Sequence, residues 1–133
     1  MKCRYFIIEP AFSDPDTFCQ ITIGGERVKA SIQIYPDEGM LYKAAAALID
    51  PDLAAEIPSP YTEDWEFHLQ LSVLPGREGQ KVLRARIWHD YEEDGTPYRA
   101  DIRLQLAPKE ATELSQELTS WLKRKDYTLC WKD

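Results

Sequence analysis

Residues 65–106 read WEFHLQLSVLPGREGQKVLRARIWHDYEEDGTPYRADIRLQL, and this stretch decides the fold. Apolar and polar residues alternate over three segments, 65–74, 81–91 and 97–106. A two-residue period is typical of a β-strand with one packed face and one solvated face. The connections between the segments are short and contain Gly, Pro, Asp and Glu, as hairpin connections do. The stretch therefore predicts three antiparallel strands.

The N-terminal part of the chain predicts further strands. Residues 2–9 form an apolar strand-like run, and Gly24-Gly25 separates two alternating segments in the manner of a two-residue hairpin loop. Such a loop fixes the register of the two strands, and it places Ile21 opposite Val28. We therefore expect a β-hairpin centred on the two glycines.

Two helices are also predicted. Residues 40–49 contain four consecutive alanines, the best helix-forming residue, and carry an apolar stripe. Residues 108–125 begin with a proline suited to a first helical turn, place Trp121 in an apolar stripe, and end in basic residues that complement the helix dipole. Residues 50–57, which start with Asp-Pro, predict a short helical turn, and residues 127–131 predict a closing strand.

These elements predict one α+β domain covering residues 1–133. The expected fold is a mainly antiparallel sheet of about six to seven strands, in the order β-ββ-α-βββ-α-β, with the helices packed on its apolar face. A chain of 133 residues with 44% hydrophobic residues is large enough to bury a single core.

The charge of the chain narrows the classes of partner. A formal net charge of −7 repels nucleic acids and anionic membranes at long range and favours basic partners. The apolar run at residues 2–9 is too short for the core of a signal peptide, and no stretch approaches the length of a membrane span. We therefore expect a cytoplasmic protein that binds no membrane, with nucleic acid an unlikely partner.

The chemistry-bearing residues predict no catalytic residue, no metal site and no cofactor. Cys3, Cys19 and Cys130 are far apart and fit no metal-ligand spacing, while His68 and His89 lack any of the usual ligand motifs. The chain also contains no nucleophile elbow and no glycine-rich phosphate loop. An enzyme is disfavoured by these observations, but it stays open as an alternative.

The solvated face of residues 65–106 is the most informative surface. The expected strand register pairs Leu83 with both Leu71 and Leu106, and on the reverse side it aligns a charged row next to an exposed tryptophan. Tryptophan beside arginine is typical of binding hot spots. The predicted binding surface consists of His68, Arg84, Arg86, Trp88 and Arg103, with His68, Arg86 and Arg103 in one row.

Three other interpretations stay open. The face could be an ordinary solvated sheet whose arginines pair diagonally with acidic side chains. His89, Tyr91 and Tyr98 could supply the polar groups of a small-molecule or catalytic pocket between sheet and helix. Nucleic-acid binding is a weaker alternative, because the net charge opposes it. That alternative would use Arg84, Arg86, Arg99 and Arg103.

The layout of residues 65–125, a sheet of hairpins followed by an amphipathic helix with a basic end, resembles that of several small bacterial immunity proteins. The resemblance is one of architecture and acidity, and it assigns no functional residue. It implies a non-enzymatic protein that acts by binding another protein, as an inhibitor or immunity-type protein does. The identity of that partner is not predicted, and a homodimer is possible.

Overall fold

The computed structural model describes residues 4–10, 19–25, 27–34, 38–52, 55–57, 67–89 and 98–133. They form the elements β1 (Tyr5–Pro10), β2 (Cys19–Gly24), β3 (Lys29–Ile34), α1 (Glu38–Ile49), β4 (Ala55–Ile57), β5 (Phe67–Pro75), the 3-10 turn η1 (Arg77–Gly79), β6 (Lys81–His89), β7 (Tyr98–Leu106), α2 (Pro108–Arg124) and β8 (Leu129–Lys132). Every strand pair is antiparallel. The predicted α+β class is therefore confirmed.

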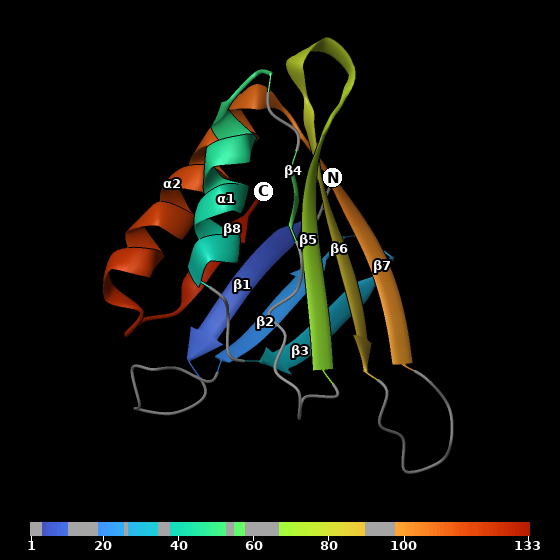
Figure 1. The fold of residues 1–133 in the computed structure, drawn as a ribbon, viewed down its shortest axis with the longest axis vertical. Helices are drawn as coiled ribbons and strands as arrows, with labels where there is room; N and C mark the ends of the chain where they lie inside the picture. The colour runs from blue at the N-terminus through green and yellow to red at the C-terminus, as the bar shows by residue number, and fades with distance from the viewer. Residues whose placement is uncertain are drawn as a thin grey trace.

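The strands form two sheets instead of the single sheet expected. One sheet has the order β3-β2-β1-β8 and the other has the order β4-β5-β6-β7. Strand β3 lies against β5, β6 and β7, and the two sheets cross at this place (Figure 1). Two sheets with one apolar face each can cover one another as well as the helices.

The helices lie side by side and bridge the two sheets (Figure 1). Helix α1 contacts β4 and β5, while α2 contacts β8. Ser115 of α2 joins the helices directly, because its hydroxyl donates a 2.7 Å hydrogen bond to the carbonyl oxygen of Ala45. Trp121 is fully buried, as predicted, and its indole N–H donates to the carbonyl oxygen of Tyr127 at 2.8 Å. The buried side chains form one hydrophobic core.

The β2–β3 hairpin has a longer loop than predicted. Ile21 pairs with Ile32 instead of Val28, and Gly24 belongs to β2, where it pairs with Lys29. Gly24 is needed in the strand because a Cβ at this position would collide with the ring of Tyr5 on β1. The loop therefore begins one residue later, and Val28 lies in it with 51% of its surface exposed.

The registers of β5–β6 and β6–β7 each differ from the prediction by two residues. Leu83 pairs with Val73 and Leu104, not with Leu71 and Leu106. A shift of two keeps every apolar side chain on the packed face, so alternation cannot detect it. The β5–β6 loop is five residues long and contains two left-handed residues, Glu78 (φ 53°) and Gly79 (φ 80°).

The predicted helical turn over residues 50–57 is wrong at its C-terminal end. Residues 55–57 form strand β4, which pairs with β5. The carboxylate of Asp50 accepts the N–H of Asp52 at 2.9 Å, which makes a local turn and not a helix cap. Residues 55–57 form a strand because they pair with the edge of β5 that β6 leaves open.

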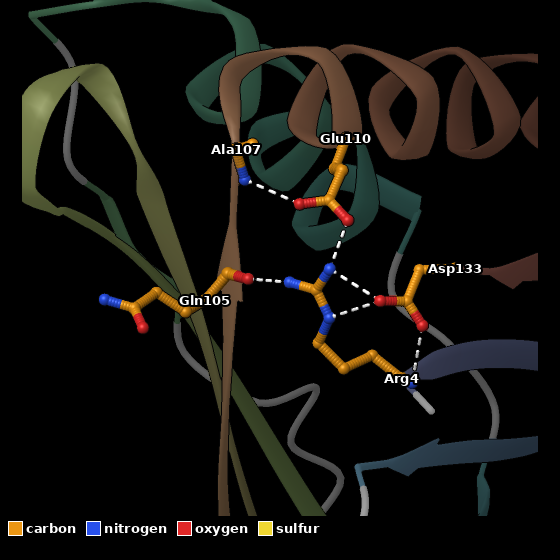
Figure 2. A network of polar contacts seen from close by, with 5 residues as sticks. All are labelled: Arg4, Gln105, Ala107, Glu110 and Asp133. Atoms are coloured by element: carbon orange, nitrogen blue, oxygen red, sulfur yellow. Dashed lines mark hydrogen bonds and ion pairs between the residues drawn. The ribbon is translucent and has the colours of Figure 1, made fainter. Parts of the chain in front are cut away.

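A cluster around Arg4 ties the two sheets together (Figure 2). All three guanidinium nitrogens donate: Nε to Asp133 at 2.9 Å, Nη2 to both Asp133 and Glu110, and Nη1 to the carbonyl oxygen of Gln105. Glu110 also accepts the N–H of Ala107 at 2.9 Å, next to the start of α2. We call this set of residues the Arg4 cluster.

Candidate binding surface

The outward side of β5, β6 and β7 carries the polar residues that alternate with the core. We call this surface the arginine face. The strand registers arrange it in three rows, which are His68–Trp88–Arg99, Gln70–Arg86–Asp101 and Ser72–Arg84–Arg103. The predicted row of His68, Arg86 and Arg103 is therefore wrong, because each strand is displaced by two residues from the expected register. All five predicted residues nevertheless lie on this one face.

Trp88 occupies the centre of the first row and stacks on His68. The two ring centroids are 5.0 Å apart and the rings are inclined by only 14°. Trp88 is half-buried, and Arg99 is its neighbour on β7. The stack holds the indole against the sheet, so one broad aromatic surface is presented in a fixed orientation. A rigid, partly exposed aromatic of this kind suits binding, because little conformational entropy is lost on contact.

Arg84 and Arg103 face each other across the β6–β7 pair, and Asp101 relieves their repulsion. Two Arg84 nitrogens donate to the carboxylate of Asp101, at 3.0 and 2.6 Å. The hydrogen bond from Arg84, with the positive charges of Arg84, Arg103 and Arg86, lowers the pKa of Asp101 below its ordinary value. The diagonal pairing of an ordinary solvated sheet thus accounts for one arginine, Arg84.

The other three arginines of the face make fewer polar contacts among the described residues. Arg86 makes a long contact of 3.5 Å with the side-chain oxygen of Gln70. Within the described ranges, no ion pair involves Arg86, Arg99 or Arg103, and all three are exposed. Among the described side chains of β5, β6 and β7, the face carries four arginines and one carboxylate, that of Asp101, so this part of the surface is locally positive on a chain whose net charge is −7.

An open groove runs over the arginine face. Its volume is about 540 Å³, and it is lined by Gln70, Arg84, Arg86, Ile87, Trp88, Arg99, Ala100 and Asp101. Arg99, Asp101 and Gln70 were not part of the predicted binding surface. The alternation of residues 97–106 places Arg99 and Asp101 on the same face as Arg103, so this signal could have identified them. The alternation of residues 65–74 likewise places Gln70 on the same face as His68.

The alternative pocket lies largely outside the described residues. Tyr91 is not among them, and His89 and Tyr98 are described by their backbone alone, which pairs across β6 and β7. The hypothesis of a pocket that uses these three side chains therefore stays a prediction.

The cysteines occupy different environments on the first sheet. Cys19 of β2 is buried, and burial raises the pKa of its thiol to about 12. Cys130 of β8 is exposed, while Cys3 lies outside the described residues. In the part of the chain that is described, no group of three or more His, Cys, Asp or Glu side chains could hold a metal ion.

Comparison of the chain with protein-family models, curated proteins and solved structures found no match. The architectural resemblance to small bacterial immunity proteins therefore stays a prediction. Neither described helix combines the length and the apolar character that a membrane span needs.

Proposed function

We propose that this protein acts by binding an acidic surface of another protein through the arginine face. The observation that carries the proposal is the Trp88–His68 stack beside an open groove lined by arginines. Tryptophan and arginine are the residues that most often dominate the free energy of protein–protein binding. Both lie here in the middle of one sheet face.

The charge of the face favours an acidic partner. Arg86, Arg99 and Arg103 are exposed and within the described residues have no carboxylate partner, so a carboxylate brought by another protein would meet unneutralised guanidinium groups. A planar guanidinium binds a carboxylate through two parallel hydrogen bonds, which adds geometric selectivity to charge attraction. The overall charge of −7 disfavours extended polyanions such as nucleic acid, whereas a local acidic patch on a protein needs only this one face.

An inhibitor or immunity-type role agrees with this mode of binding. A protein that blocks another by occupying its surface needs a rigid contact face and no chemistry of its own. The three central strands supply the rigidity, because β6 is paired along its full length on both sides. The partner would be identified by its acidic contact patch.

The proposal is tested by capture from native lysate with matched variants. The bait is the wild-type chain, a Trp88→Ala/Arg86→Glu variant, or a Lys109→Glu variant that makes the same charge reversal at an exposed position of helix α2. We expect a stoichiometric protein to be retained by the wild type and by Lys109→Glu, and to be lost from the double variant.

The affinity of the captured protein then gives a quantitative test. Trp88→Ala alone should weaken binding by at least about 1 kcal/mol, roughly a fivefold loss, when measured by calorimetry. A loss of no more than a few tenths of a kcal/mol would remove the arginine face from the interface. Retention of the same protein by all three baits would have the same meaning.

A further inference from the structure

We infer that the partner binds by adding an extended acidic segment as a new strand along the free edge of β7. This inference rests on the proposed function and specifies how the arginine face is used. It starts from the position of β7, which is nine residues long and has β6 as its single neighbour within the second sheet.

The hydrogen bond at Gln105 shows which backbone groups of β7 face away from β6. The carbonyl oxygen of Gln105 accepts from Arg4, which lies on the side of β7 away from β6 (Figure 2). In an antiparallel pair, residues alternate between those whose N–H and C=O point to the partner strand and those whose groups point away. Residues of the same parity as Gln105 therefore turn their backbone groups outward, and these are Arg99, Asp101 and Arg103.

These outward groups form a bounded, open segment. The Arg4 cluster occupies the carbonyl at Gln105 and ends the segment there. Among the described residues, no hydrogen bond uses the backbone N–H or C=O of residues 99, 101 or 103 on this side. Five residues in extended conformation span about 17 Å, which matches an ordinary strand. A row of unpaired backbone groups of this length is a template for another strand.

A second depression lies beside this edge. Its volume is about 380 Å³, and it is lined by Arg4, Gly25, Arg27, Val28, Asp101, Ile102, Arg103, Leu104 and Gln105. It adjoins the groove over the arginine face at Asp101. The exposed Val28 offers an apolar contact for a bound segment, and Arg27 adds a further positive charge. A strand paired with β7 would therefore lie between β7 and the loop that joins β2 to β3.

The side chains along the edge select an acidic occupant. Arg99 and Arg103 lie on the exposed face, where cross-strand neighbours on an added strand would stand directly beside them. If the central residue of the added strand lies opposite Asp101, acidic residues two positions before and after it lie opposite Arg99 and Arg103. A second copy of this chain is a less suitable occupant, because two molecules with a net charge of −7 repel one another.

The test uses amide hydrogen exchange by NMR on the full isotope-labelled chain. The probe is the synthetic peptide acetyl-Val-Glu-Val-Thr-Val-Glu-Val-amide, and the control peptide has Lys in place of both Glu residues. At saturating acidic peptide, we expect the amides of Arg99, Asp101 and Arg103 to exchange about tenfold more slowly. The amides of Ala100 and Ile102 already point to β6 and should not change, so new protection at every second residue is the signature of strand addition. The Lys peptide should produce no protection.

Two variants at Arg103 separate the backbone from the side chain. Arg103→Ala removes the charge but keeps the N–H, and we expect a several-fold weaker affinity for the acidic peptide. Arg103→Pro also removes the outward N–H, and it should weaken binding by about a further tenfold. Unchanged amide spectra outside β7 establish that each variant keeps the native fold.

Each other outcome overturns a defined part of the inference. If the acidic peptide shifts the Trp88 indole signal without protecting β7 amides, strand addition is wrong while binding to the arginine face stands. If neither site responds to the acidic peptide, strand addition and acidic-peptide binding by this face both fail. If the β7 amides become protected as protein concentration rises without peptide, the occupant is a second copy of the chain.

Discussion

Arg4 and the arginines of β6 and β7 show two uses of the same side chain within one small domain. Every nitrogen of the Arg4 guanidinium donates to an acceptor within the protein, and its side chain is 11% exposed. Arg99 and Arg103, by contrast, are exposed, and no ion pair is formed by either among the described residues. The sequence context of the three residues gives little hint of this difference.

The difference follows from what surrounds each arginine. Arg4 adjoins β1, where Asp133, Glu110 and the end of β7 converge on it from three distant parts of the chain (Figure 2). Its guanidinium also lies 6.0 Å from the ring centroid of Trp131, so its charge is held against an aromatic face. The guanidinium groups of Arg99 and Arg103 project from the outer surface of an edge strand. An arginine is structural where the fold supplies its acceptors, and is available for binding where the fold does not.

The largest effect that would sharpen this comparison is expected for Arg4→Ala. The change leaves Asp133 and Glu110 without their common partner in a largely desolvated position, so we expect unfolding free energy to fall by about 3 kcal/mol. Urea unfolding monitored by tryptophan fluorescence measures it. Arg103→Ala is the matched control and should change stability by less than about 0.5 kcal/mol. Equal losses of stability for the two variants would show that Arg4 is no more structural than Arg103.

An intermediate effect is expected at Glu110, which serves two donors. Glu110→Ala removes the acceptor for Arg4 and for the N–H of Ala107, and we expect a loss of about 2 kcal/mol. Glu110→Gln keeps an oxygen for the N–H of Ala107 but loses the charge, so about half of that loss should remain. The same urea unfolding measurement applies. A loss for the Gln variant as large as that for the Ala variant would show that the charge contact with Arg4 carries the whole effect.

Local patterns in the sequence predicted both helices, the strands other than β4, and the faces of the long strands. For the described side chains of residues 68–88 and 99–106, the alternation gives the correct inward and outward faces, since parity depends only on the two-residue period. The stripe of residues 108–125 gives helix α2 and the burial of Trp121. Local periodicity was sufficient wherever a single element determined the answer.

The features that were missed depend on contacts between distant residues. The hairpin register required knowing that Tyr5 lies over Gly24, and the division into two sheets required knowing that β8 pairs with β1. The Arg4 cluster joins residues 101 to 129 positions apart, which no local pattern reveals. The binding surface was predicted as a set of residues but not as an arrangement, because a two-residue register shift changes every neighbour and leaves the faces intact.

The smallest effect on stability is expected for a change at Asp101, which holds Arg84 on the exposed arginine face. The pKa of Asp101 is lower in the folded protein than in the unfolded chain, so its pairing with Arg84 stabilises the fold fully above the unfolded-state pKa. This stabilisation disappears as the pH falls through the lower folded-state pKa, below about pH 4. Because Asp101 is exposed, Asp101→Asn should cost less than about 1 kcal/mol near pH 7. Urea unfolding of both proteins at a series of pH values from 7 downward should show the difference shrinking once the pH falls below about 4.

The same substitution should have the opposite effect on binding. Asp101→Asn removes a carboxylate that accepts two hydrogen bonds from Arg84, and it raises the local positive charge by one. We therefore expect acetyl-Val-Glu-Val-Thr-Val-Glu-Val-amide to bind the variant up to a few-fold more tightly at low salt, with the gain shrinking as salt is added. A loss of stability together with a gain of affinity would show that Asp101 holds arginines that a partner could otherwise use. A loss of both would instead make Asp101 part of the contact surface.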